Sequence, residues 1–351
     1  MSRGIGYYVH HQGAGHAERA RRIGERLTRR CTLIGTGLDQ VGAPGPILDL
    51  PDDRMTDAFD GTDGAAERPA CLHYAPLDHA GVRTRMAEIA AWIARTDPVL
   101  MIVDVSVEVA LLARLLSVPT LTVRLAGTRT DTPHLEAFRA ATRLIAPFPE
   151  ALDSDATPDW VRSKTLYAGF VGAPAVSDGA EDGRIVVVFG RGGEGGRLDD
   201  LVAAARALPE RPWHVLGPVH GPTPRPALPP NLHLHGWVED VARHLAPAAL
   251  VIGGGGDGVV AAVASLGKRF LCLPEPRPFG EQTEKAAALA RLGAAVTHEG
   301  WPEARSWPDL VARALALDPA IIRALARPDT ARRVAVEIDA IADRLDGRAR
   351  R

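Results

Sequence analysis

Residues 184–208 of the chain, RIVVVFGRGGEGGRLDDLVAAARAL, contain the pattern that decides the fold. The apolar run Arg184–Phe189 is followed by a glycine-rich turn, and Leu198–Leu208 is then predicted to be a helix. An apolar run without polar alternation is typical of a strand that is buried on both faces, as in a parallel sheet covered by helices. The stretch therefore predicts one strand–turn–helix unit of a doubly wound α/β domain.

The same pattern recurs along the chain on both sides of this stretch. In the first half, strands are expected at Gly4–His10 and Val99–Asp104, and a helix with apolar residues at helical spacing is expected at Ala17–Arg29. In the second half, the predicted strand Leu250–Ile252 precedes the predicted helix Val259–Leu266. Two such series in one chain predict two Rossmann-like, doubly wound α/β domains that face each other across a cleft.

A polar stretch that contains glycine, Pro174–Gly183, is expected to link the two domains. The predicted domains then span residues 1–173 and residues 184–328. A closing helix is predicted at residues 329–346, and packing back onto the first domain is one arrangement that the sequence allows.

Composition and charge exclude several classes of protein. The chain has 351 residues, and its 41 basic and 43 acidic residues give a net charge of -2, which provides no reason to bind nucleic acid. The longest apolar runs, Val107–Ala113 and Val259–Ala264, are far shorter than the ~20 residues of a membrane-spanning helix. The three cysteines suggest neither a disulfide framework nor a zinc motif, which favours a reducing, cytoplasmic environment.

The segment between the first predicted strand and the first predicted helix, His10-His11-Gln12-Gly13-Ala14-Gly15-His16, is the first candidate site. Gly13 and Gly15 would let the backbone approach a ligand, and the start of a helix favours anions. His16 is placed where its side chain could point into a cleft. An ordinary flexible turn with solvent-facing histidines is the alternative interpretation.

Two loops after predicted strands of the first half carry further polar residues. Asp104 could orient a base or bind an acceptor hydroxyl group, because ligands of open α/β sheets bind at the carboxyl ends of the strands. Ser106 and Glu108 follow it, and capping of the next helix is the alternative role for this segment. The loop at residues 124–134 is interpreted as an acceptor pocket or as a solvated loop, and the candidates in it are Arg124, Arg129 and His134.

The second half contains two glycine-rich turns, each between a predicted strand and a predicted helix. The first turn has neither the full context of the dinucleotide fingerprint nor the Lys-Ser/Thr pair of a P-loop. Its amides and one guanidinium could hold a phosphate, and the candidates are Arg191, Gly192, Gly193 and Gly195. The second turn offers Gly254, Gly255 and Gly256 to a diphosphate, although the charge of Asp257 would repel that ligand if it faced the same way.

Glu281 and Gln282 follow another predicted strand, and their side chains are suited to hydrogen bonds with sugar hydroxyl groups. The alternative interpretation is the solvated start of a helix. Together with the glycine-rich turns they predict a pocket for a nucleotide-diphosphate sugar. Here the chain resembles the GT-B glycosyltransferases and is most similar to the MurG-type enzymes of glycosyltransferase family 28. The resemblance rests on the loop that ends in His16 and on Leu250–Leu292, a strand, small residues, a helix and then the Glu281-Gln282 pair.

The resemblance implies a GT-B fold with the acceptor on the first domain and the donor on the second. It implies backbone contacts to the base near Trp237 and Val238, and a nucleotide-sugar co-substrate with no metal. The family's ribose-binding glutamate corresponds to Ala262 here, so the resemblance does not specify the nucleotide. The acceptor half matches only at its first loop, so a lipid-linked acceptor does not carry over.

A glycosyltransferase of this kind would transfer the sugar with inversion to a small-molecule or glycolipid acceptor, and nothing in the sequence indicates contact with a membrane surface. His16 is the first choice for the general base, since histidine changes its protonation near neutral pH; Asp104 is the second choice or orients His16. Hydrolysis or epimerisation of the nucleotide sugar, and a non-catalytic accessory protein, remain open as alternatives. His233 and His235 alternate on a predicted strand, but no third ligand is evident beside them, so no metal site is predicted.

Overall fold

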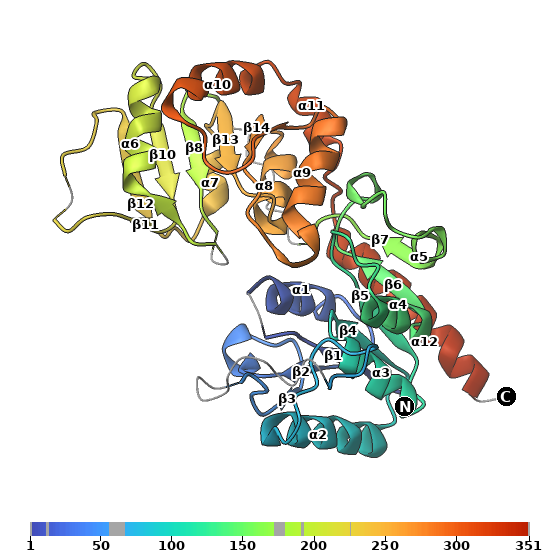
Figure 1. Cartoon of the computed structure of the whole chain (residues 1–351). Helices are drawn as coiled ribbons and strands as arrows, with labels where there is room; N and C mark the ends of the chain where they lie inside the picture. Colours follow the sequence, from blue (N-terminus) through green and yellow to red (C-terminus); the bar gives the residue numbers. More distant parts are fainter. Residues whose placement is uncertain are drawn as a thin grey trace.

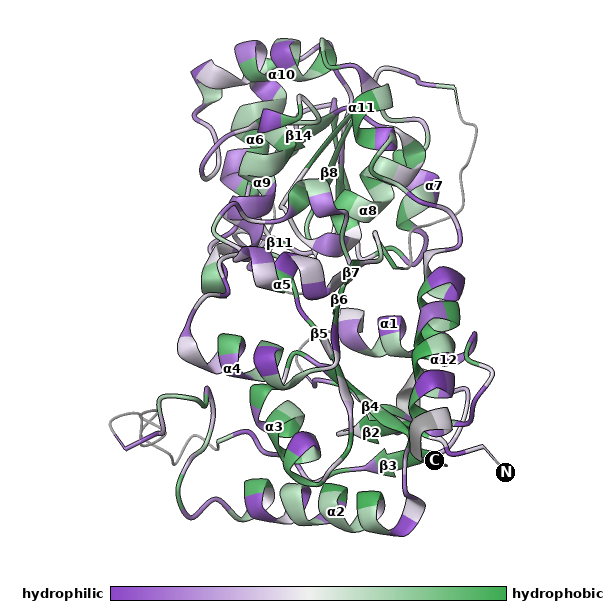
Figure 2. Ribbon diagram, turned by 90° about the vertical axis from the view of Figure 1, so that its right-hand side faces the viewer, coloured by the Kyte–Doolittle hydropathy of each residue, from purple (hydrophilic) through white to green (hydrophobic). Residues whose placement is uncertain are grey.

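The computed structural model describes residues 2–11, 14–55, 67–171, 180–190, 193–224 and 226–349. In these residues each half of the chain forms a parallel sheet (Figure 1). The apolar side chains of each sheet enter two cores, one on either face, and each core is closed by helices. Figure 2 shows apolar strands between helices whose outer faces are hydrophilic. This is the doubly wound α/β architecture that the apolar runs predict.

The first sheet has the strand order β3-β2-β1-β4-β5-β6-β7. Its strands are β1 (Ile5–Tyr8), β2 (Cys31–Gly35), β3 (Ile47–Asp49), β4 (Leu100–Asp104), β5 (Thr120–Val123), β6 (Arg143–Ala146) and β7 (Thr165–Tyr167). Its helices are α1 (Ala14–Gly24), α2 (Ala80–Thr96), α3 (Val107–Leu115), α4 (Thr132–Ala140) and α5 (Asp159–Lys164). Helix α1 begins and ends earlier than the predicted Ala17–Arg29.

The second sheet has the order β12-β10-β8-β13-β14-β15, beside a two-stranded sheet of β11 and β9. The strands are β8 (Ile185–Val188), β9 (Gly196–Arg197), β10 (Trp213–Leu216), β11 (Val219–His220), β12 (Leu232–Gly236), β13 (Leu250–Gly253), β14 (Phe270–Cys272) and β15 (Val296–Thr297). The helices are α6 (Leu198–Ala207), α7 (Val241–Leu245), α8 (Asp257–Leu266), α9 (Glu281–Arg291), α10 (Trp307–Leu315) and α11 (Pro319–Arg323). Among the described residues, no helix combines the length and the apolar character that a membrane span requires.

The last helix, α12 (Thr330–Ala349), leaves the second domain and packs against the first (Figure 1). Its Val334, Ile338 and Ile341 share one apolar core with strands β1 and β4. At its far end, Arg29 pairs with Asp343 at 2.7 Å and with Asp346 at 2.9 Å. The end of the chain therefore completes the first domain.

Polar contacts join the two domains. The Thr128 N–H donates to the Phe279 carbonyl oxygen at 2.8 Å, and the Ser154 hydroxyl donates to the Glu284 carboxylate at 2.9 Å. Phe279 and Glu284 belong to the segment that enters and forms α9. The first domain therefore rests against the same segment that carries Glu281 and Gln282.

Arg124, which the sequence analysis places in an acceptor pocket, lies inside the first domain instead. Its side chain is 1% exposed and that of Asp153 is 0% exposed. Arg124 Nη1 and Nη2 donate to the two Asp153 oxygens at 3.0 and 2.5 Å, and the Tyr167 hydroxyl donates to Asp153 at 2.5 Å. Burial alone would raise the pKa of Asp153, but Arg124 and its other donors hold it below the ordinary value. The loop carries a structural ion pair where a substrate contact was expected.

We expect Arg124→Met to destabilise the protein strongly, because it leaves the Asp153 carboxylate buried without its cation. Breaking a buried pair in this way costs about 3–5 kcal/mol. Arg139→Met is the matched control, since Arg139 makes an exposed pair with Glu136 at 2.7 Å, and such pairs contribute about 0–1 kcal/mol. Urea unfolding of both variants measures the difference. Equal, small losses would show that the buried pair is not needed to hold this part of the fold.

Candidate active site

Both sheets reverse their strand order once, and the predicted site segments lie at these reversals. In the first sheet the chain runs from β1 out to β3 and returns to β4 on the other side of β1; in the second, β8 lies between β10 and β13. Open α/β sheets bind ligands at such a reversal, outside the carboxyl ends of the strands. His16 and Asp104 follow or end β1 and β4, and the glycine-rich turns follow β8 and β13.

His16, Asp104 and Arg19 form one cluster at the reversal in the first sheet. His16 Nδ1 lies 3.0 Å from Asp104 Oδ1, and Arg19 Nη2 lies 2.9 Å from each oxygen of the Asp104 carboxylate. Asp104 is completely buried and Arg19 nearly so. Arg19 is not among the predicted site residues, although a spacing of three residues places it on the same face of α1 as His16.

The cluster determines which nitrogen of His16 carries a proton. Burial alone would raise the pKa of Asp104, but Arg19 and His16 hold it below the ordinary value, so this carboxylate is an ionised acceptor. Arg19 Nη2 also lies 2.9 Å from His16 Nδ1. A guanidinium only donates and this one has both Asp104 oxygens as acceptors, so we assign the Nδ1 proton to the bond with Asp104. Nε2 is then the nitrogen with the free lone pair.

The backbone beside Asp104 is strained. Val105 has φ of 56°, in the left-handed region that a β-branched residue rarely adopts. Such a conformation costs about 1–3 kcal/mol and persists only when the surroundings impose it. The next residue, Ser106, caps α3 by accepting a hydrogen bond from the Val109 N–H at 3.3 Å. The capping role therefore describes Ser106, and the tight turn at Val105 separates this cap from Asp104.

His10 adds a second imidazole beside His16, with the ring centroids 5.6 Å apart. Burial, together with the neighbouring His16 and His11, lowers the pKa of His10 to about 4. At neutral pH His10 is therefore uncharged. It borders His16 without adding a positive charge to the cluster.

In the second domain, Gln282 braces the second glycine-rich turn. Its Oε1 accepts hydrogen bonds from the Gly255 N–H at 2.8 Å and from the Glu275 N–H at 3.0 Å, and the residue is 6% exposed. A Cβ atom at Gly255 would lie 2.9 Å from the Gln282 carbonyl oxygen, so glycine is required there by the close approach of the backbone. The Oε1 atom of Gln282 thus holds backbone amides, which differs from the sugar contact that the sequence analysis expects.

Asp257, at the start of α8, forms an ion pair with Lys285, whose side chain is completely buried. Burial alone would raise the pKa of Asp257, but Lys285 lowers it below the ordinary value. Arg19 and His16 of the first domain also lower this pKa. The charge that the sequence analysis regards as repulsive for a diphosphate is therefore compensated by a neighbouring cation. Contacts between the loop after β5 and the start of α9, such as the one from the Thr128 N–H to the Phe279 carbonyl oxygen, bring the carboxyl ends of the two sheets toward each other.

A cavity of about 390 Å³ lies at the carboxyl ends of β8, β13 and β14. Both glycine-rich turns line it, through Gly193 and Gly195 of the first and Gly254 of the second, and Phe189 and Trp301 supply apolar walls. Its size lies within the ~300–1,000 Å³ of small-molecule sites. The charged residues Glu194, Glu275 and Arg277 also line it.

The other predicted site residues have separate environments. The Glu281 carboxylate lies 3.4 Å from Arg129 Nη2 across the domain boundary, so this predicted donor residue contacts a predicted acceptor residue. Trp237 is 52% exposed after β12, and Val238 packs against the core beneath α8. Gly15 is exposed in the first turn of α1, whereas the predictions for Gly13, Arg191 and Gly192 lie outside the described residues.

No protein-family model matches the chain. A UDP-N-acetylglucosamine–N-acetylmuramyl-(pentapeptide) pyrophosphoryl-undecaprenol N-acetylglucosamine transferase of Exiguobacterium sp. is 33% identical over 124 residues, a match that spans 33% of this chain and 34% of the relative. Among solved structures, the glycosyltransferase of kitacinnamycin has a TM-score of 0.70 at 17% identity, covering 97% of this chain and 99% of its own. MurG of Acinetobacter baumannii has a TM-score of 0.66 at 17% identity, covering 97% and 100%. The chain therefore has the GT-B fold, as the resemblance predicts.

We expect Gln282→Ala to lower stability, since it leaves two backbone amides without their acceptor. Each unpaired buried group costs about 1–3 kcal/mol. Thr283→Ala is the matched control, because Thr283 is the exposed neighbour on α9. The thermal midpoints of the two variants show whether Gln282 stabilises the turn. If Gln282→Ala unfolds at the same temperature as the native protein, other contacts hold the turn.

Proposed function

We propose that this chain is a glycosyltransferase that moves a sugar from a nucleotide-diphosphate sugar to a hydroxyl group of an acceptor, with inversion and with no metal at the diphosphate. The His16–Asp104 pair, on the sheet reversal that faces the glycine-rich turns, carries this proposal. The GT-B fold and the partial match to a bacterial N-acetylglucosamine transferase support the reaction class. A nucleotide sugar and a small-molecule or glycolipid acceptor would be the partners.

The proposed general base is His16. Its Nδ1–H donates to the ionised Asp104, which leaves the lone pair of Nε2 to accept the proton of the acceptor hydroxyl. The acceptor oxygen then bonds to the anomeric carbon while the bond from that carbon to the diphosphate oxygen breaks. The bonding electrons leave with the nucleotide diphosphate, and the proton remains on His16. Asp104 stabilises the imidazolium that forms, as a buried carboxylate does in other catalytic pairs.

The leaving diphosphate would be stabilised by the second domain. The first-turn amides of α8 have no partner inside the helix, and the helix dipole favours negative charge at this end. Preorganised amides act on the charge that develops in the transition state. The pairing of Asp257 with Lys285 supports this assignment, because the carboxylate at the same helix end carries its own counter-ion.

The proposed compartment is the cytoplasm of a bacterium. The two buried cysteines and the half-buried Cys71 are all free thiols in the structure. Free thiols persist in reducing compartments. The proposed reaction requires a nucleotide sugar as co-substrate, and this requirement is compatible with the cytoplasm.

A donor is first identified by the thermal shift that uridine, thymidine and guanosine diphosphate sugars produce, since a true donor raises the midpoint with concentration. With that donor, His16→Ala should lower kcat by roughly 10²–10⁴-fold, the range for removal of a general base. The affinity for the nucleotide diphosphate should stay unchanged, because its contacts lie on the other domain. Steady-state kinetics and calorimetric titration measure the two effects, with His244→Ala on α7 as the control.

Three results would contradict parts of this proposal. Recovery of full kcat by His16→Ala at high acceptor concentration would make His16 a binding group and assign the base to Asp104. Release of free sugar as the main product, with acceptor present, would indicate a hydrolase. Tight binding of a nucleotide sugar without turnover by any acceptor would indicate the accessory protein.

A further inference from the structure

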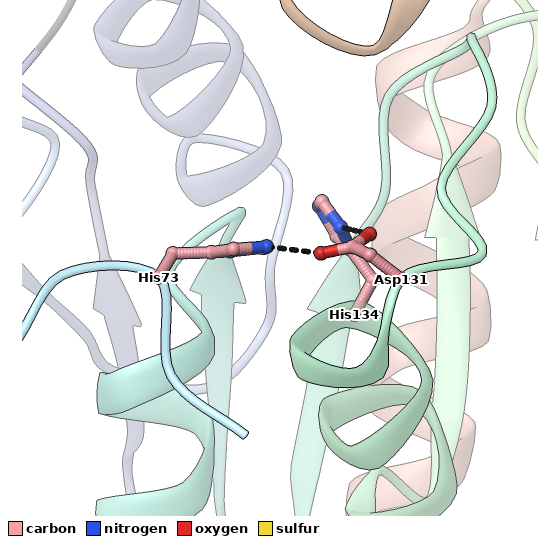
Figure 3. A group of neighbouring side chains, drawn as sticks. All are labelled: His73, Asp131 and His134. Atoms are coloured by element: carbon pink, nitrogen blue, oxygen red, sulfur yellow. Dashed lines mark hydrogen bonds and ion pairs between the residues drawn. The ribbon is translucent and has the colours of Figure 1, made fainter. Parts of the chain in front are cut away.

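A second cluster of histidine and aspartate lies in the first domain, apart from His16 and Asp104. Figure 3 shows His73 and His134 each joined to a different oxygen of the Asp131 carboxylate. His73 Nε2 lies 2.5 Å from Asp131 Oδ2, and His134 Nδ1 lies 2.5 Å from Asp131 Oδ1. One ligand atom from each of the three side chains falls within 4.8 Å of the other two. Among the described residues, no other group of three His, Cys, Asp or Glu side chains brings its ligand atoms together in this way.

Each of the three side chains is positioned by its own surroundings. Asp131 is the residue before α4 and His134 lies in the first turn, so helix geometry sets their spacing. His134 is 5% exposed and packs edge-on against Phe279 of the second domain, with ring centroids 4.7 Å apart. His73 lies on a loop whose backbone is held by Glu108, which accepts from the His73 N–H at 2.7 Å. The start of α4 therefore positions Asp131 and His134, and Glu108 of α3 holds the loop that carries His73.

We propose that His73, Asp131 and His134 bind one divalent transition-metal ion of the Zn²⁺ type. Two imidazoles and one carboxylate form a donor set that suits Zn²⁺ and related ions, whereas Mg²⁺ and Ca²⁺ require oxygen ligands. The ion would take the place of the two hydrogen bonds to Asp131, with the ring protons leaving those nitrogens. The side chains of His73 and Asp131 are 29% and 34% exposed, which leaves room for water or a further ligand on the ion.

Arg129 limits the affinity of this site and couples it to the domain boundary. Its Nη1 lies 3.2 Å from His134 Nε2, so Nε2 accepts there and the ring proton is on Nδ1, toward Asp131. If His134 binds the ion through Nδ1, the proton on Nδ1 must leave. A neutral ring then carries its proton on Nε2, and Arg129, which donates to Nε2, must move away. Arg129 keeps a partner when it does so, because its Nη2 already lies 3.4 Å from Glu281. The ion would therefore change the contact between the two domains.

A competing location is the histidine patch on the edge of the second sheet, formed by His214, His233, His235 and His244. His214 Nδ1 lies 2.9 Å from His235 Nε2, and the ring of His244 lies 5.0 Å from that of His235. The structure thus adds two imidazoles to the pair noted in the sequence. This patch has no carboxylate among its four members. No three of its imidazoles bring their ring nitrogens together as closely as the ligand atoms of His73, Asp131 and His134. We therefore assign the ion to His73, Asp131 and His134.

The test is a Co²⁺ titration of the full chain after dialysis against a chelator, followed by visible absorption and by displacement with Zn²⁺. One equivalent should bind to the native protein. His73→Ala and Asp131→Asn should each weaken binding by more than ~100-fold, since changes even in outer-shell partners cost about 10–100-fold. His235→Ala is the matched control and should bind as the native protein does. Circular dichroism shows whether each variant is folded, and because His73 is only half-buried on a loop, that variant is expected to fold.

Several outcomes would overturn the proposal. Saturable binding that survives in folded His73→Ala shows that the ion is held elsewhere, and its loss in His235→Ala would place it on the histidine patch. Absence of saturable binding in the native protein removes the site altogether. The measurement needs no sugar donor, so its result is independent of whether the chain transfers sugar.

Discussion

A carboxylate that is buried at the end of a strand must be paired, and the candidate site of the first domain is built around that requirement. Asp104 has no contact with solvent, and both its oxygens accept from Arg19 while one also meets His16. Removing Arg19 would leave this carboxylate buried without its cation, at a cost of about 3–5 kcal/mol. The pairing fixes the start of α1 relative to the ends of β1 and β4. The strained backbone at Val105 is maintained in this setting because the turn after β4 is held from both sides.

The site of the second domain is held in a different way, because buried side chains of α9 contact the backbone and the first residue of the neighbouring helix. A glycine-rich turn leaves amides unpaired, and it has no side chains of its own to hold it. Helix α9 supplies what is missing, because Gln282 accepts from Gly255 and Lys285 pairs with Asp257. The same helix start is touched by the first domain through Phe279. Movement of one domain against the other would therefore act on the segment that braces the turn.

The fold could be predicted from the sequence because strands such as β8, β13 and β14 are unbroken apolar runs, and the turns after β8 and β13 are rich in glycine. His16 and Asp104 were found for the same reason, since both follow such runs. Arg19, His73 and the Arg124–Asp153 pair were harder to place, because each depends on contacts between segments far apart in the sequence. A charged residue in a loop has the same local pattern whether it faces solvent, a ligand or a buried partner. Only the packing decides between these roles.

Asp104 and Asp131 illustrate how similar residues can be given different chemistry by burial. Each is an aspartate that contacts a histidine ring at the carboxyl side of the first sheet. Asp104 is completely enclosed and both its oxygens accept from Arg19, so the arrangement is closed to an ion and favours a fixed proton on His16. Asp131 is about one-third exposed and lies between two imidazoles. Its partners can exchange protons for a metal ion, which a guanidinium cannot do. The two proposed roles, proton transfer beside Asp104 and metal binding at Asp131, follow from this difference in enclosure.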